Sequence, residues 1–304
     1  MRDGHLLVGQ GSIEYYRFFS YPWKSVASVV YNSGLVALRS RLALCLAATL
    51  TAIGVLRAEE ASVFGRTDNS EAGLIGILYD LKQTQKRQPT GVKAGEYSGI
   101  LNEFLAKDWS ESVLNRYFRA TRPLYATQIF MPLMDAGKAP KAFDMEKVIK
   151  PSAWVVVFKG QVSPPEDGTY RFVAYADDVI AAALNGKTVV IGGRADTVNH
   201  LKVWKAQPNG GPRVESANGL LAYGDWMTLK KDEPVDLDVL VGERPGGQFC
   251  AFLLYEKQGV EYPKNEKGVP QYPIFQLAPF QTPSSSPREA PPFSQANATW
   301  KGYQ

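Results

Sequence analysis

The sequence predicts a mainly β fold, an antiparallel β-sandwich with a short helical insertion near its start. From Trp154 onward the chain is a series of short segments rich in β-branched and aromatic residues, several of which alternate apolar and polar side chains. Tight-turn signals separate these segments, and helical periodicity is confined to residues 91–118. Short strands joined by tight turns, with few helices, are typical of a β-sandwich.

The helical insertion follows a first strand, which we expect in the apolar run that begins at Gly73. The stretch GILNEFL (Gly99–Leu105) then places its apolar residues on one helical face. Asp108 and Glu111 have the spacing of a capping box, which predicts a second short helix that continues to Phe118.

The β segments are predicted in order along the rest of the domain. WVVVFKGQV begins at Trp154 and TYRFVAYA at Thr169. AAALNGKTVV contains an Asn-Gly pair at Asn185, which is the strongest short hairpin signal. PVDLDVLV and QFCAFLLYEK flank a Pro-Gly-Gly loop and predict two further strands.

A Gly/Asn-rich excursion over residues 192–224 is too long for a structureless connection in a compact domain, and such loops often form binding surfaces. Trp204 lies in this excursion, where its ring could stack on a sugar, although packing in the core explains it equally well. We expect Trp226 in the core, because WMTL has the pattern of a strand start.

The first 58 residues are predicted to be absent from the mature protein. Arg39 and Arg41 precede the uncharged apolar run Leu42–Leu56, and Ala58 is followed by two acids, which is the layout of a secretory signal peptide. The run is shorter than the roughly 20 residues that span a bilayer. We therefore expect residues 1–58 to be an N-terminal extension plus signal peptide, with translation starting near Val36, and the chain to be exported to the periplasm, the cell surface or the medium. A buried internal helix is the alternative.

The mature chain then keeps Cys250 as its single cysteine, so it forms no internal disulfide. At the other end, residues 263–304 are rich in Pro and Ser and predict an extended tail with little apolar surface to bury. Trp300 in this tail is either a docking anchor or an exposed aromatic residue.

Composition excludes several classes of function. The formal net charge is +4, and it falls close to neutral without residues 1–58, so no basic patch for nucleic acid is expected. The mature chain has one histidine, His200, and one cysteine, which leaves little material for a Cys/His nucleophile or a zinc site. No Gly-rich phosphate loop links a strand to a helix. We therefore predict that the protein is not an enzyme.

The adjacent acids Asp177 and Asp178 interrupt an apolar strand pattern. One interpretation is that they hold a cation, because Ca²⁺ takes six to eight oxygen ligands and neighbouring carboxylates supply several. The other is that one carboxylate accepts hydrogen bonds from nearby backbone N–H groups while the second faces solvent.

The order of FKGQVSPPEDGTYRFVAYADD (Phe158–Asp178), LNGKTVV, PVDLDVLV and FCAFLLYEK resembles the PA-fourteen (protective-antigen-type) family. This is a β-sandwich domain of bacterial exported proteins, glycosidases and yeast adhesins. We place the domain over residues 73–262. The chain departs from the family pattern at Val179, where glycine is usual, and in the longer, more helical segment before residue 150.

The resemblance implies a non-catalytic, exported carbohydrate-binding module. In the sugar-binding adhesin branch the two acids are joined by a cis peptide bond and coordinate calcium, which holds sugar hydroxyls. It thus implies Asp177 and Asp178 as ligands of a calcium cofactor. These two acids, together with Trp204 from the long excursion, are the predicted sugar-binding residues. Further ligands are expected from GERPGGQ (Gly242–Gln248) or TVNHLKVW (Thr197–Trp204). The alternative is a structural or protein-interaction module of the cell envelope, in which the acids only shape a loop and the partner is a protein rather than a glycan.

Overall fold

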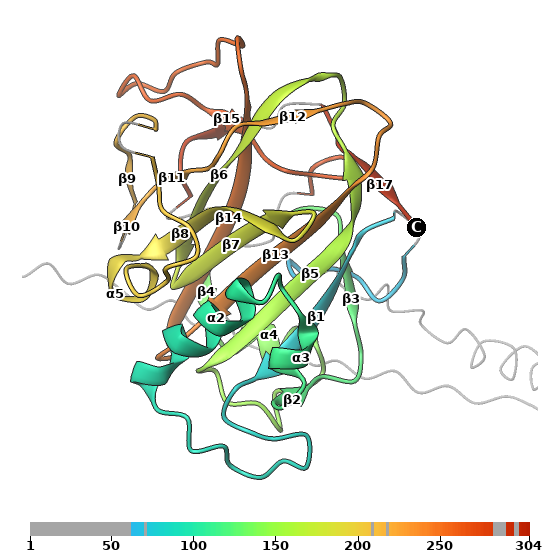
Figure 1. Ribbon diagram of the computed structural model, residues 1–304, viewed down its shortest axis with the longest axis vertical. Coiled ribbons are helices and arrows are strands. Elements are labelled where there is room, and N and C mark those ends of the chain that lie inside the picture. Colours follow the sequence, from blue (N-terminus) through green and yellow to red (C-terminus); the bar gives the residue numbers. More distant parts are fainter. Residues whose placement is uncertain (1–61, 70–71, 208–209, 217–218, 282–289, 295–297) are drawn as a thin grey trace, which may run out of the picture. The chain divides into compact units, whose positions relative to one another are not determined.

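The computed structural model describes residues 62–69, 72–207, 210–216, 219–281, 290–294 and 298–304 (Figure 1). The predicted N-terminal extension and signal peptide, residues 1–58, lie outside this part of the chain. No helix within the described ranges has the length and apolar character needed to cross a membrane.

The larger of two antiparallel sheets contains ten strands of the described chain, in the order β2-β1-β5-β13-β7-β8-β10-β9, with β3 also paired to β1 and β17 to β5. Its strands are β1 (Leu74–Asp80), β2 (Phe118–Arg119), β3 (Leu124–Ala126), β5 (Trp154–Ser163), β7 (Val179–Leu184), β8 (Lys187–Arg194), β9 (Glu215–Ser216), β10 (Gly219–Leu220), β13 (Val235–Glu243) and β17 (Lys301–Tyr303). The predicted hairpin joins β7 to β8 through Asn185 and Gly186, both with positive φ, as a tight hairpin turn requires.

The smaller sheet has the order β11-β6-β14-β4, with β12 paired to β6. Its strands are β4 (Phe130–Asp135), β6 (Gly168–Asp177), β11 (Ala222–Tyr223), β12 (Met227–Leu229) and β14 (Gln248–Lys257). A short parallel pair is formed by β15 (Tyr272–Pro273) and β16 (Phe293–Ser294). The helical elements are η1 (Ala94–Glu96), α2 (Tyr97–Ala106), α3 (Glu111–Leu114), α4 (Lys138–Ala142) and α5 (Ala195–Val198). The predicted fold class, mainly β and antiparallel with an early helical insertion, is confirmed.

The main core lies between the two sheets, because side chains alternate along each strand. On β6, Phe172 and Ala174 point into this core, where they join Phe158 of the large sheet. Val173 and Tyr175 point to the opposite face of the same strand and are also buried. The strand therefore has a covering layer on each side.

The helical insertion covers the outer face of the large sheet, as Figure 1 shows for α2 and α3. Leu101, Phe104 and Trp109 pack there against Val155 and Ala181. On the outer face of the small sheet, Tyr272 and Ile274 of the C-terminal segment cover Tyr175 and its neighbours. β7 is apolar throughout instead of alternating because the main core covers one of its faces and the helical insertion covers the other.

Two expectations about local structure need correction. The C-terminal segment does bury apolar surface: Trp300 is 1% exposed, and its ring packs 5.5 Å from those of Tyr170 and Phe275 within the main core. The adjacent β17 pairs with β5. The second helix was also placed wrongly, because its cap is Ser110, which accepts from the backbone N–H of Ser112, and Phe118 belongs to β2.

Candidate functional site

The acid pair lies where the chain passes from one sheet to the other. Asp177 is the last residue of β6 in the small sheet, and β7 of the large sheet begins at Val179. The peptide bond between Asp177 and Asp178 is cis, as the family resemblance implies. Both residues are buried, with exposed fractions of 5% and 1%.

Backbone contacts hold Asp178 from two strands. Its Oδ2 accepts a hydrogen bond from the N–H of Arg244, just beyond β13, at 2.7 Å. Its carbonyl oxygen accepts from the N–H of Arg194, at the end of β8, at 2.8 Å. The close approach of β8 depends on Gly193, whose φ is +143° and where a Cβ would lie 2.1 Å from the Asp178 carbonyl oxygen.

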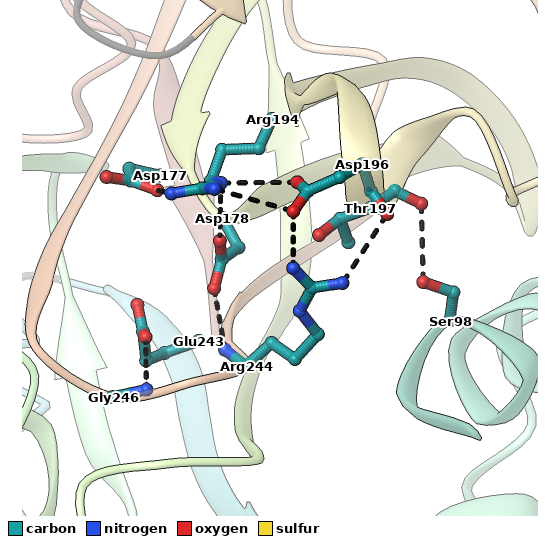
Figure 2. A network of polar contacts seen from close by, with 9 residues as sticks. All are labelled: Ser98, Asp177, Asp178, Arg194, Asp196, Thr197, Glu243, Arg244 and Gly246. Carbon is teal, nitrogen blue, oxygen red and sulfur yellow. Dashed lines mark hydrogen bonds and ion pairs between the residues drawn. The ribbon is translucent and has the colours of Figure 1, made fainter. Parts of the chain in front are cut away.

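The guanidinium of Arg194 lies between the acids, as Figure 2 shows. Its Nε is 3.3 Å from Oδ1 of Asp178, and its Nη1 is 3.7 Å from Oδ1 of Asp177. On its other side, Nε donates to Oδ1 of Asp196 in α5 at 3.2 Å. One arginine therefore contacts three carboxylates.

A row of charged side chains extends from this arginine toward solvent. Asp196 also accepts from Nη2 of Arg244 at 2.5 Å. Hydrogen bonds from Arg194, reinforced by Arg244, hold the pKa of the Asp196 carboxyl below its usual value. The side chains of Asp196 and Arg194 are 47% and 34% exposed, so this row is the accessible side of the site.

Glu243 adds a further buried carboxylate, 1% exposed, at the end of β13. Its Oε1 accepts from the N–H of Gly246 at 2.8 Å, whereas its buried Oε2 has no hydrogen-bond donor among the described residues. Burial raises the pKa of Glu243 to about 8, and the charge of Asp178 adds to this rise. Burial likewise raises the pKa of Asp178 to about 6. The site thus contains more acidic than basic groups.

The residues of this site fit a calcium ion poorly. In the described part of the chain, no three His, Cys, Asp or Glu side chains are grouped so that they could hold one metal ion. Asp178 uses Oδ2 for the Arg244 N–H, and its Oδ1 faces the Arg194 guanidinium. A positively charged side chain therefore lies where an ion would need to sit, and calcium coordination by Asp177 and Asp178 stays a prediction.

The two tryptophans named from the sequence have different surroundings. Trp204 is half-buried and packs against both the main core and the cluster under the helices. Trp226 is 41% exposed, so its expected core position is wrong. It precedes β12, whose Met227 pairs with Tyr170 at the opposite end of β6 from Asp177. The guanidinium of Arg171 lies against the face of the Trp226 ring, 4.4 Å from the ring centre.

Of the two stretches expected to complete the site, Gly242–Gln248 contributes Glu243 and the Arg244 N–H. Sequence reasoning missed Arg194 and Asp196. The signal for them was the Asn185 turn, because the hairpin pairs Val179 with Gly193 and so brings the next residues beside Asp178. His200 follows α5 in a turn, and Cys250 is buried in β14.

Comparison with known proteins supports the resemblance over part of the chain. Residues 144–203 match the family model of the PA14 domain, a range that includes the acid pair, Arg194 and Asp196. The resemblance to this family is thereby confirmed over that segment. No curated protein sequence matches the chain.

Solved structures similar to the chain include three PA14-type domains. The PA14 sugar-binding domain from an RTX adhesin has 17% identity and a TM-score of 0.38, over 68% of this chain and 96% of that one. The PA14 domain of the antifreeze protein MpAFP has 13% identity and a TM-score of 0.37, over 68% and 87%. The epithelial adhesin 9 A domain from Candida glabrata, solved with Galβ1-4GlcNAc, has 14% identity and a TM-score of 0.36, over 66% and 90%.

Proposed function

We propose that the chain is an exported, non-catalytic carbohydrate-binding module whose ligand contacts the accessible side of the acid-pair site. The observation that carries this proposal is the solvent-facing row of Asp196, Arg194 and Arg244, in which donors and acceptors alternate. The match of residues 144–203 to the PA14 domain family supports it, because this segment contains the acid pair and most of the row.

The chemistry of the row suits sugar hydroxyls. A hydroxyl both donates and accepts, so neighbouring hydroxyls on a sugar ring can donate to a carboxylate and accept from a guanidinium at the same time. Hydrogen bonds that involve a charged partner are also stronger than neutral ones. The buried acids hold the guanidinium of Arg194 in place before a ligand arrives, which reduces the entropy lost on binding.

The site does not suit hydrolysis of a glycosidic bond by the usual carboxylate pair. Asp177 and Asp178 are chain neighbours, and the Arg194 guanidinium faces Oδ1 of both. Two carboxylates that act across a scissile bond are instead separated by about 5–10 Å and face each other across the sugar. We therefore assign recognition, and no reaction, to this site.

A glycan array probed with the labelled full chain tests the proposal. We expect wild-type protein to bind a defined set of glycans and Asp196→Asn to weaken that binding at least tenfold, because the variant removes the charged acceptor. The matched control is Glu215→Gln, which changes a 73% exposed carboxylate paired with Arg213 elsewhere in the same excursion. The proposal fails if wild-type protein binds no glycan, or if Asp196→Asn binds as well as the control. Capture of an envelope protein without any glycan would favour the interaction-module alternative.

A further inference from the structure

The chain itself places a positive charge, the Arg194 guanidinium, beside the acid pair. The facing oxygens of the two acids, Oδ1 of Asp177 and Oδ1 of Asp178, both lie within 4 Å of nitrogen atoms on the Arg194 guanidinium, at 3.7 and 3.3 Å. An arginine stays protonated at any pH at which the protein is folded. A metal ion bound through these two oxygens would compete with the guanidinium for them.

The backbone fixes the direction of this arginine. The N–H of Arg194 donates to the carbonyl oxygen of Asp178 at 2.8 Å, and Gly193 permits that approach. Asp196 holds the guanidinium from a third side, with contacts of 3.2 Å to Nε and 3.4 Å to Nη2. The Arg194 side chain is therefore held at its backbone and at its guanidinium. Little side-chain entropy remains to be lost when it contacts the acid pair.

The second carboxylate oxygen of Asp178 is already engaged. Oδ2 of Asp178 already accepts from the N–H of Arg244, and the residue is 1% exposed. A divalent ion shared by both acids would therefore have to reach Oδ1 of Asp178, where it would meet the positive charge of Arg194 at close range. It would bind only after the guanidinium had been displaced from three carboxylates.

We propose that Arg194 is the resident cation of the Asp177–Asp178 pair and excludes calcium from it, so that the ligand is bound without metal. Buried carboxylates need a positive partner, and this chain supplies the partner from its own hairpin. The statement about the ligand rests on the proposed carbohydrate-binding function. The exclusion of calcium does not, because it concerns only residues of this chain.

A calcium titration of the full chain, followed by melting temperature and by calorimetry, tests the exclusion. We expect the melting temperature of wild-type protein to be unchanged by calcium or by chelator. Arg194→Gln frees the two Oδ1 atoms, so we expect it to gain calcium affinity by at least tenfold and to be stabilised by the ion through mass action. The control Arg213→Gln, an exposed arginine of the same excursion, should behave as wild type.

Adding Asp177→Asn to Arg194→Gln should abolish the gained calcium response, because the ion would then lose one carboxylate. If Arg194→Gln does not fold, Arg194→Lys replaces it, since a lysine keeps the charge but cannot contact three carboxylates with a planar fork. We expect a smaller gain for that variant. An equal calcium response in wild-type protein and the variant that is tested, whether saturable or absent in both, overturns the proposal.

The effect of chelator on the glycan array separates this proposal from the function. Glycan binding by wild-type protein that survives EDTA supports metal-free recognition, and binding abolished by EDTA and restored by calcium overturns it. An array without any binding refutes the proposed function and leaves the calcium titration to decide the role of Arg194.

Discussion

Two buried clusters of charge on the same strand, β6, differ in how well their charges are balanced. Near its start, Arg171 faces Glu256 of β14 across the small sheet, with Nε donating to Oε2 at 2.7 Å. The same guanidinium lies 4.8 Å from the Tyr223 ring centre and 4.4 Å from that of Trp226. At the end of the strand, Arg194 and Arg244 face a larger number of carboxylates, and Oε2 of Glu243 has no donor within the described chain.

The difference separates a structural ion pair from a candidate binding site. The Arg171–Glu256 pair matches one positive charge with one negative charge. Its contacts come from neighbouring strands and a loop, so the charges are balanced within the folded chain. The acid-pair site keeps a surplus of negative charge and strongly raised carboxyl pKa values, which is the condition found more often at functional sites than at structural ones. Three substitutions probe this contrast.

Arg171→Met should have the largest effect on stability. It leaves Glu256 without its counter-ion and removes the cation–π contacts with Tyr223 and Trp226, so we expect a loss of about 3–5 kcal/mol in the free energy of unfolding. Urea unfolding followed by tryptophan fluorescence measures it. Arg213→Met at an exposed pair should cost less than about 1 kcal/mol. Equal losses for the two variants would show that the Arg171 cluster is not a structural ion pair.

Glu256→Gln should have an intermediate effect in the same direction. The amide keeps the size of the side chain and one acceptor for Arg171, but it leaves the largely buried guanidinium without a negative charge. We expect a loss of about 2 kcal/mol, because a hydrogen bond to a charged group contributes roughly 1.5–3 kcal/mol. The same urea titration provides the value, and a variant as stable as wild type would count against the balance we assign to this pair.

Much of the strand pattern could be predicted from the sequence. The alternation over Thr169–Ala176 and the Asn185 turn are local signals, and each depends only on residues close together in the chain. The acid pair could also be recognised from the local sequence, because two adjacent charges interrupt an apolar strand pattern. Its partners lie 17 and 67 residues away from Asp177 along the chain, at Arg194 and Arg244. Only the pairing of β7 with both β8 and β13 brings them together.

The errors of prediction have a common physical origin. Trp226 was expected in the core because it precedes a strand, yet the ring is supported by Arg171, a contact between residues 55 positions apart. Trp300 was left between two interpretations because its docking site is made by β6, β14 and Phe275. Local sequence patterns show which side chains are apolar. Which residues pack against those side chains depends on the sheet topology, which brings distant segments of the chain together.

The central claim is that the acid-pair site carries surplus negative charge. The melting temperature of Glu243→Gln relative to wild type tests this claim directly. The pKa of Glu243 is about 8 in the folded protein, above its ordinary value of 4.5. Between these values the folded state binds more protons than the unfolded chain, so wild-type protein loses stability as pH rises. Gln keeps the acceptor for the Gly246 N–H and removes the charge. We predict no stability advantage for the variant near pH 4 and a melting temperature about 2 °C above wild type at pH 8. If Glu243→Gln instead melts below wild type at pH 8, as we expect of Glu256→Gln, the acid-pair site carries no surplus negative charge.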